Sequence, residues 1–521
     1  MEKSLRHQIG QMIIAGFPSL EVDDQACRLV EEYQVGNFIL FARNMKTARQ
    51  TAALCDGLSR MTFEKLGVAP FISADQEGGM VSRITEGAAL FSGAMALSAG
   101  ADLQQARQVG KNCGEMLRAM GINVNFAPVL DVNIEPMNPI IGNRSYGDDP
   151  QRVADVGCAV MEGMVEGGVI ATLKHYPGHG NVNTDSHLDL PVNHTDPAVL
   201  EKTEFLPFQQ AFRRGAPALM SCHIVFPKID PELPATLSPA IIGDLLRKKQ
   251  GFDGLVFTDC MEMDAIQKGW GMARGAVLAV AAGCDVLCIS HHLEQVQSAV
   301  EAIEQAVADG IIPRSRIQES YDRIMAAKKK MGLLEMQQVS LEQAEAVIHD
   351  EEKIALHKQV ARNSVTLLCD KGGLSALQQA KKPMILAPVF QSSTGVEDKE
   401  YDGRSFARSA GAALGWDFVE YPMTPTEEER AAVLAAVSQA DALVLGLYNC
   451  RFRESQRALV EQVFGKGIPV VAALLGGPYD IPYAAKADAA VCCYEYTPLA
   501  VSALVEALRT GEFYGKLPIK L

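Results

Sequence analysis

The stretch Lys174–His187 carries an unusual density of ionisable side chains. Three histidines, a lysine and an aspartate fall within fourteen residues, and a proline and two glycines prevent a regular helix there. It follows the apolar, strand-like run Gly168–Leu173, and five of the chain's ten histidines lie between His175 and His223. Parallel α/β folds place chemistry on irregular loops that leave an apolar strand. The concentration therefore predicts a functional loop rather than a solvated loop with incidental histidines.

Asp185 and His187 are the pair in this loop that can move a proton. A carboxylate and an imidazole two residues apart in an extended segment can hydrogen-bond, which fixes the imidazole tautomer and raises its basicity. Such a pair can protonate a leaving oxygen and later activate a water molecule. Glycosidases usually use two carboxylates for these two tasks, whereas here the acid and base would be an imidazole.

Asp259 follows the apolar run Gly254–Thr258 and would enter the mouth of a barrel. A carboxylate in such a place is costly unless it is used or paired. One role is a nucleophile that attacks the anomeric carbon of a sugar. The other is an N-cap for the segment that follows, since Asp is a preferred cap. The residue alone leaves both roles open.

Five further residues could hold a sugar through its hydroxyl groups. Lys174, His175 and Arg144 can donate hydrogen bonds, while Asp75 supplies an acceptor and Arg83 a further donor. A carboxylate that accepts from two vicinal hydroxyls is a recurrent way to hold a pyranose. The alternative for the two arginines is a structural ion pair.

Asp131 and His223 also follow predicted strands, and we include both among the substrate-binding candidates, although Asp131 could equally brace loops. A metal site is the main competitor for the histidines, because His175 and His179 have the spacing of a helical zinc pair. The proline and glycines between them forbid a stable helix, and no further ligand pair completes the set at the usual spacings. We predict neither a metal nor a cofactor.

Eight short apolar runs alternate with helical patterns over roughly the first 330 residues. The runs are Gln11–Phe17, Val35–Phe41, Pro70–Ala74, Ile122–Pro128, Gly168–Leu173, Ala218–Cys222, Gly254–Thr258 and Asp285–Ile289. Eight strand–helix units predict an α/β fold of the (β/α)8 TIM-like barrel type, which carries its active site on the loops after the strands. The polar candidates named above lie at those exits.

The remaining chain predicts a second, smaller α/β domain. Six strand-like runs are expected there, at Ser364–Cys369, Pro383–Ala387, Asp417–Tyr421, Ala442–Leu447, Pro469–Leu475 and Ala489–Tyr494. We predict a catalytic barrel over residues 1–335, a helical linker over 336–360 and an α/β sandwich domain over 361–521. No phosphate-binding glycine loop follows the first of these strands.

The composition excludes several classes of partner. Lys plus Arg is 48 and Asp plus Glu is 63, which gives a net charge of −15 and argues against nucleic acid or an anionic membrane surface as a partner. The apolar piece Met12–Ala15 is too short for a signal-peptide core, and no apolar run could span a bilayer. Twelve scattered cysteines without a CxxC pair suggest reduced thiols. We expect a cytoplasmic protein.

Several motifs resemble a known family. Lys-His-Tyr-Pro-Gly-His-Gly (174–180), followed after four residues by Asp-Ser-His (185–187), resembles the signature of glycoside hydrolase family 3 β-N-acetylglucosaminidases, which remove N-acetylglucosamine from peptidoglycan fragments. Supporting pieces are Ile-Leu-Phe-Ala-Arg-Asn (39–44), Asp-Gln-Glu-Gly-Gly (75–79), Asn-Phe-Ala-Pro-Val-Leu-Asp-Val (125–132), Asn-Arg-Ser-Tyr-Gly (143–147) and Phe-Thr-Asp-Cys-Met-Glu-Met (257–263).

The resemblance implies a retaining mechanism with Asp259 as nucleophile and the His187–Asp185 dyad as acid and base. It also implies sugar binding by Asp75, Arg83, Arg144, Lys174 and His175. The family's β-glucosidase branch lacks Asp-Ser-His and takes its acid/base Glu from the second domain. Met80 and Cys260 depart from the residues that are common at their positions, which could retune the pocket.

Three functions stay open at this point. The first is an exo-β-N-acetylglucosaminidase that acts on peptidoglycan fragments or chitin-derived sugars. The second is a phosphorylase that passes the sugar to phosphate instead of water. The third is a sugar-binding or assembly protein without catalysis, which the complete set of catalytic candidates argues against. The partner is a small saccharide, and the second domain is expected to brace the barrel or form a homodimer rather than supply catalytic groups.

Overall fold

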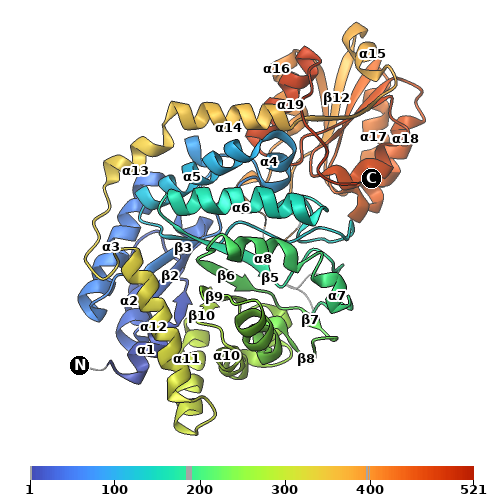
Figure 1. The fold of residues 1–521 in the computed structure, drawn as a ribbon. Helices are drawn as coiled ribbons and strands as arrows, with labels where there is room; N and C mark the ends of the chain where they lie inside the picture. Colours follow the sequence, from blue (N-terminus) through green and yellow to red (C-terminus); the bar gives the residue numbers. More distant parts are fainter. Residues whose placement is uncertain (1–2, 184–189, 393, 395–396, 398, 521) are drawn as a thin grey trace.

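The first part of the chain forms a closed parallel barrel in the computed structural model, which describes residues 3–183, 190–392, 394, 397 and 399–520 (Figure 1). Around the barrel the strand order is β1-β10-β9-β6-β5-β4-β3-β2. The strands are β1 (Ile13–Ala15), β2 (Asn37–Leu40), β3 (Phe71–Ala74), β4 (Val124–Asn125), β5 (Ile170–Tyr176), β6 (Ala218–Ser221), β9 (Leu255–Cys260) and β10 (Val286–Ile289). Each lies within one of the eight predicted runs or overlaps it, so the predicted barrel is confirmed.

The barrel strands are buried along almost their whole length, which is why they read as continuous apolar runs rather than as alternating ones. Helices cover the outside of the barrel, and several of them start at side-chain caps, as when Asp102 accepts from the Gln105 backbone N–H. They include α2 (Asp24–Tyr33), α3 (Ala48–Leu66), α5 (Leu103–Ala119), α6 (Pro150–Glu166), α8 (Phe205–Arg213), η5 (Pro239–Lys249), α10 (Gly271–Ala282), α11 (Leu293–Ala308) and α12 (Arg314–Lys330). A small hairpin, β7 (Val225–Phe226) with β8 (Asp230–Pro234), follows β6.

Two helices lead from the barrel to the second sheet. These are α13 (Leu341–Ile348) and α14 (Glu351–Ser364), which run over the barrel's α5 toward the second domain (Figure 1). The predicted linker over residues 336–360 contains α13 and most of α14. The exact limits at 335 and 360 stay predictions.

The second domain is a three-layer α/β sandwich around a six-stranded sheet of order β11-β16-β15-β14-β12-β13. Only the edge strand β11 runs antiparallel to its neighbour. The strands are β11 (Thr366–Asp370), β12 (Pro383–Pro388), β13 (Asp417–Tyr421), β14 (Ala442–Leu447), β15 (Val470–Leu474) and β16 (Ala489–Cys492). Side chains alternate between two cores, one shared with α16 (Phe406–Leu414) and α19 (Pro498–Thr510), the other with α17 (Glu427–Val437) and α18 (Glu454–Phe464).

The two domains contact each other through buried hydrogen bonds. The Asn143 side chain donates to the backbone oxygens of Gly476 and Tyr494, both at 2.7 Å. The Gly93 backbone N–H donates to a Glu495 carboxylate oxygen at 2.7 Å. Asn143 and Gly93 both lie on barrel loops after strands, so the second domain sits at the carboxyl end of the barrel.

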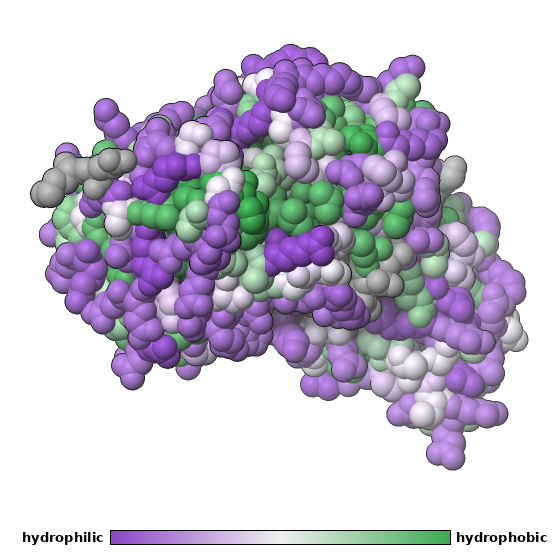
Figure 2. Space-filling view, turned by 90° about the horizontal axis from the view of Figure 1, so that it is seen from below, coloured by the Kyte–Doolittle hydropathy of each residue, from purple (hydrophilic) through white to green (hydrophobic). Residues whose placement is uncertain are grey.

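Polar side chains cover most of the surface seen from below, and an apolar band crosses the side on which α10 and α11 lie (Figure 2). The predicted homodimer stays a prediction. Among the helices of the described ranges, none has the length and apolarity to cross a membrane.

Candidate active site

A cavity of about 740 Å³ opens at the carboxyl ends of the barrel strands. Six residues predicted from the sequence line it together: Asp75, Arg83, Arg144, Lys174, His175 and Asp259. They come from the loops after β3 and β4 and from the ends of β5 and β9. The predicted acid/base residues Asp185 and His187 lie outside the described residues.

Asp259 is the fifth residue of β9 and is partly buried. One of its carboxylate oxygens accepts the backbone N–H of Cys260 at 2.7 Å. The next helix, α9 (Asp264–Gln267), begins five residues later and has Met263 at its N-cap position. Asp259 is therefore not the cap of that helix, and its carboxylate lies where it can meet a ligand in the cavity.

Lys174 and Arg144 meet at a carboxylate that the sequence analysis did not select, Glu77. The Lys174 ammonium lies 2.7 Å from both Asp75 and Glu77, and Arg144 makes a two-pronged pair with Glu77 at 2.7 and 2.9 Å. Arg83 lies 3.8 Å from Asp75. Burial would raise the pKa of Glu77, but Arg144 and Lys174 together hold that pKa well below its usual value.

Glu77 thus fixes the positions of the Lys174 and Arg144 side chains, and both side chains still line the cavity. Burial would lower the pKa of Lys174, but Asp75 and Glu77 outweigh it and raise the pKa. A charged Lys174 donates hydrogen bonds only, and the side-chain oxygens of Asp75 beside it can accept them. The set can hold several hydroxyl groups at once. The sequence signal for Glu77 was a second carboxylate two residues after Asp75, within Asp-Gln-Glu-Gly-Gly.

Asp131 orients His175 from behind the cavity wall. Its carboxylate accepts the backbone N–H groups of His175 and His179 at 3.1 and 2.7 Å, and its second oxygen lies 2.7 Å from Nδ1 of His175. Burial would raise the pKa of Asp131, but His175 outweighs it and the pKa is lowered. The carboxylate therefore accepts the Nδ1 proton, which leaves Nε2 of His175 for the cavity.

Asp131 and His223 are not among the residues that line the cavity, and their predicted sugar contacts stay predictions. His223 is buried, with Nδ1 2.8 Å from the Thr236 hydroxyl and Nε2 3.0 Å from the Cys260 backbone oxygen. It therefore supports the segment just after Asp259. In this geometry Asp131 orients His175, and His223 contacts the segment that carries Asp259.

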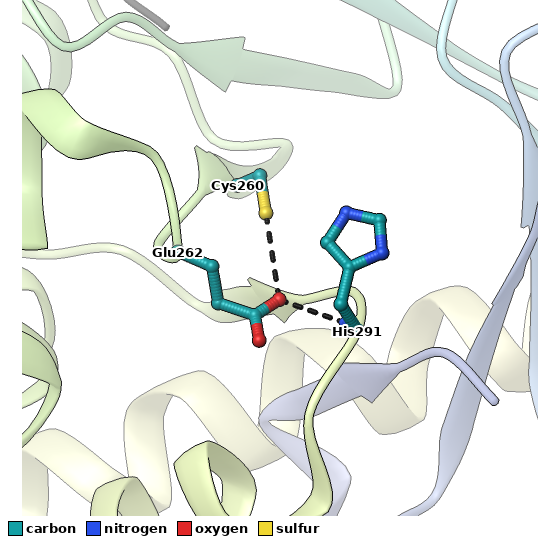
Figure 3. Close-up of side chains that lie close together, drawn as sticks. All are labelled: Cys260, Glu262 and His291. Carbon is teal, nitrogen blue, oxygen red and sulfur yellow. Dashed lines mark hydrogen bonds between the residues drawn. The ribbon is translucent and has the colours of Figure 1, made fainter. Parts of the chain in front are cut away.

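One group of described residues, Cys260, Glu262 and His291, brings metal-ligating atoms within 4.8 Å of one another (Figure 3). Glu262 already accepts the backbone N–H groups of Ser290, His291 and His292 at 2.6, 2.8 and 3.0 Å. Arg43 donates to Nδ1 of His291 at 3.2 Å. Burial raises the pKa of the Cys260 thiol to about 12.

The Glu262 carboxylate accepts hydrogen bonds from three backbone N–H groups and so connects the end of β9 to the loop after β10. A cation would also have to displace the thiol proton and lie close to the Arg43 guanidinium. The group therefore holds the loop beside Asp259 in place, and we assign it no metal.

The second domain also reaches the cavity, through Glu397 and Lys399. The expectation that this domain only braces the barrel or forms a dimer is therefore incomplete. Nothing in the sequence indicated these two residues, because their place depends on how the two domains pack.

The barrel and its cavity of paired carboxylates and cations fit an enzyme that binds a ligand with several hydroxyl groups, such as a sugar. Residues 4–327 match the model of the glycosyl hydrolase family 3 N-terminal domain, and the chain belongs to this family. A solved family 3 β-N-acetylglucosaminidase from Paenibacillus sp. str. FPU-7 is 37% identical, with a TM-score of 0.94 and coverage of 100% of this chain and 99% of that one.

Two β-hexosaminidases are similar over the barrel. The protein from Xylella fastidiosa is 36% identical over 327 residues, which is 60% of this chain and 94% of the relative. The protein from Thiobacillus denitrificans is 35% identical over 281 residues, or 53% of this chain and 76% of the relative. These similarities confirm the predicted family 3 glycoside hydrolase of the β-hexosaminidase type.

Proposed function

We propose that the protein is a retaining exo-β-N-acetylglucosaminidase with Asp259 as its nucleophile. The observation that carries this proposal is the position of Asp259 at the end of β9, in a cavity whose other wall holds Asp75, Lys174 and Arg144. The names of the relatives described above support a 2-acetamido sugar as the substrate.

In the proposed reaction the Asp259 carboxylate attacks the anomeric carbon, and the bond from that carbon to the leaving oxygen breaks. His187, oriented by Asp185, gives its proton to the leaving oxygen. In the second half, the same imidazole takes a proton from water, whose oxygen displaces Asp259 and releases the sugar. Five side chains hold the ring hydroxyls through both halves of the reaction, namely Lys174, Arg144, Asp75, Arg83 and His175.

We further propose that the substrates are peptidoglycan fragments or chitin-derived sugars and that the enzyme works in the cytoplasm. All twelve cysteines are free, which is typical of a reducing compartment.

The test uses purified protein and an aryl β-N-acetylglucosaminide, with and without millimolar phosphate. Free N-acetylglucosamine in both conditions supports the hydrolase. A sugar 1-phosphate with faster turnover in phosphate would instead indicate a phosphorylase, and no release at all would favour a binding protein. Asp259→Asn should lower turnover by several orders of magnitude while sugar binding persists in calorimetry; an unchanged rate contradicts the assignment of the nucleophile.

A further inference from the structure

Residues 399–401 of the second domain lie against the barrel loop that follows β3. Glu400 accepts a hydrogen bond from the Thr85 hydroxyl at 3.1 Å, and the Tyr401 hydroxyl donates to the Gly79 backbone oxygen at 3.4 Å. The same loop carries Asp75 and Arg83. Glu397, just before this contact, lines the cavity with them. A carboxylate of the second domain is thereby brought to the sugar-binding side of the barrel.

The carboxylate of Glu397 is held in a fixed place by Tyr448. The Tyr448 hydroxyl donates to it at 2.6 Å, and the Tyr448 side chain is only 1% exposed. The Tyr448 ring packs edge-on against Phe390 and Tyr496, with centroids 5.2 and 5.8 Å apart. Burial raises the pKa of Tyr448 well above its usual value, so its hydroxyl stays a donor. Glu397 is preorganised as an acceptor.

The position of Glu397 relative to Asp259 indicates which part of a sugar it meets. In the strand order of the barrel, β3 and β9 are four strands apart in either direction, so the loop after β3 lies across the cavity from Asp259. A ring whose anomeric carbon is at Asp259 directs its opposite end toward that loop. The hydroxyls at that end are those on C4 and C6.

We propose that Glu397 is a substrate-binding residue that accepts a hydrogen bond from the C4 or C6 hydroxyl of the terminal sugar. The second domain would thus recognise the non-reducing end of the substrate and favour cleavage of the terminal sugar. This proposal rests on the proposed function, because it places the anomeric carbon at Asp259.

The test compares an aryl β-N-acetylglucosaminide with its 4-deoxy and 6-deoxy analogues. A hydrogen bond to a charged acceptor contributes about 1.5–3 kcal/mol, so Glu397→Ala should lower kcat/KM on the parent sugar about 10- to 100-fold. Glu397→Gln keeps a neutral acceptor and should lose less. On one of the two analogues the Ala variant should lose almost nothing further, because the hydroxyl that Glu397 binds is already absent.

Tyr448→Phe removes one of the hydrogen bonds that position the Glu397 carboxylate, so it should give an intermediate loss on the parent sugar. Glu428→Gln is the control: it changes an exposed carboxylate of the second domain that does not line the cavity, and it should alter kcat/KM less than twofold. Thermal melting of each variant identifies misfolding. Activity of the wild-type enzyme on the parent sugar tests the proposed function separately.

Two results would overturn the assignment of Glu397. One is an equal loss on the parent sugar and on both analogues. The other is a loss confined to substrates with poor leaving groups, together with a changed pH profile, which would make Glu397 a proton donor instead.

Discussion

Glu77 is the carboxylate with which Lys174 and Arg144 both form an ion pair. Glu77→Gln would remove a carboxylate that neutralises two buried cations, and would leave Asp75 as a partner of Lys174. An uncompensated buried charge costs about 3–5 kcal/mol. We expect kcat/KM to fall about 100-fold or more, mainly through KM, and the urea midpoint of unfolding to decrease. Steady-state kinetics and urea titration measure the two effects.

The exposed Glu86, further along the same loop, provides the control. Glu86→Gln should leave both quantities unchanged. If Glu77→Gln had kinetics and stability close to those of the wild type, Glu77 would not be what holds the two cations.

At the residue scale, the sequence predicted those groups that leave an apolar strand directly. Asp259 and Lys174 were found in this way, because strand exits converge at one end of a barrel. Glu77 was missed because its partners are distant in sequence, and Glu397 because it belongs to the other domain. The predicted sugar contacts of Asp131 and His223 stay predictions, because a position after a strand does not distinguish a side chain that lines the cavity from one that lies behind its wall.

Among the elements, α12 supplies a buried lysine that joins it to the residues just before the barrel strands β1 and β2. The Lys328 ammonium donates to the Gln11 side chain at 2.7 Å and to the Gly36 backbone oxygen at 3.0 Å. The side chain is fully buried, and burial lowers its pKa well below the usual value. A folded-state pKa below the unfolded one means that the unfolded chain binds more protons, so stability is lost as pH falls.

Lys328→Met removes this titration. The free energy of unfolding of the wild type, relative to the variant, should therefore increase between pH 7 and pH 9.5, as measured by urea unfolding at both values. Lys329→Met, at the exposed next position of α12, should show no such change. A difference between wild type and Lys328→Met that does not vary with pH would mean that the Lys328 pKa is not lowered.

At the element scale, periodicity and apolar runs predicted all eight barrel strands and six strands of the second sheet. They did not predict the exact extent of β4 or the hairpin strand β8, which depend on tertiary contacts. Only two residues of the run Ile122–Pro128 pair as β4. The hairpin strand β8, Asp230–Pro234, is partly exposed and contains two prolines, so it has no pattern that distinguishes it from a loop.

For the molecule as a whole, Glu495 is a titratable group buried where the two domains meet. It accepts hydrogen bonds from the Gly93 backbone N–H at 2.7 Å and from the Thr497 hydroxyl at 2.9 Å. It also lines a small cavity together with Glu77 and Arg144. Burial raises the pKa of Glu495 from its ordinary value of 4.5 to about 7. The packing of the two domains is therefore coupled to pH.

Because the folded protein holds this proton more tightly than the unfolded chain, stability is lost as pH rises from 4.5 to about 7. A shift of this size corresponds to about 3 kcal/mol. Glu495→Gln can still accept from Gly93 and lacks the titration, so it should match the wild type near pH 4.5 and be more stable by up to that amount at pH 8. Glu428→Gln, at an exposed position of α17, should match the wild type at both pH values.

The free energies of unfolding of Glu495→Gln and the wild type, plotted against pH, could instead run parallel. That result would show that Glu495 is already ionised in the folded protein near pH 5, and that the contact between the domains does not respond to pH through this residue.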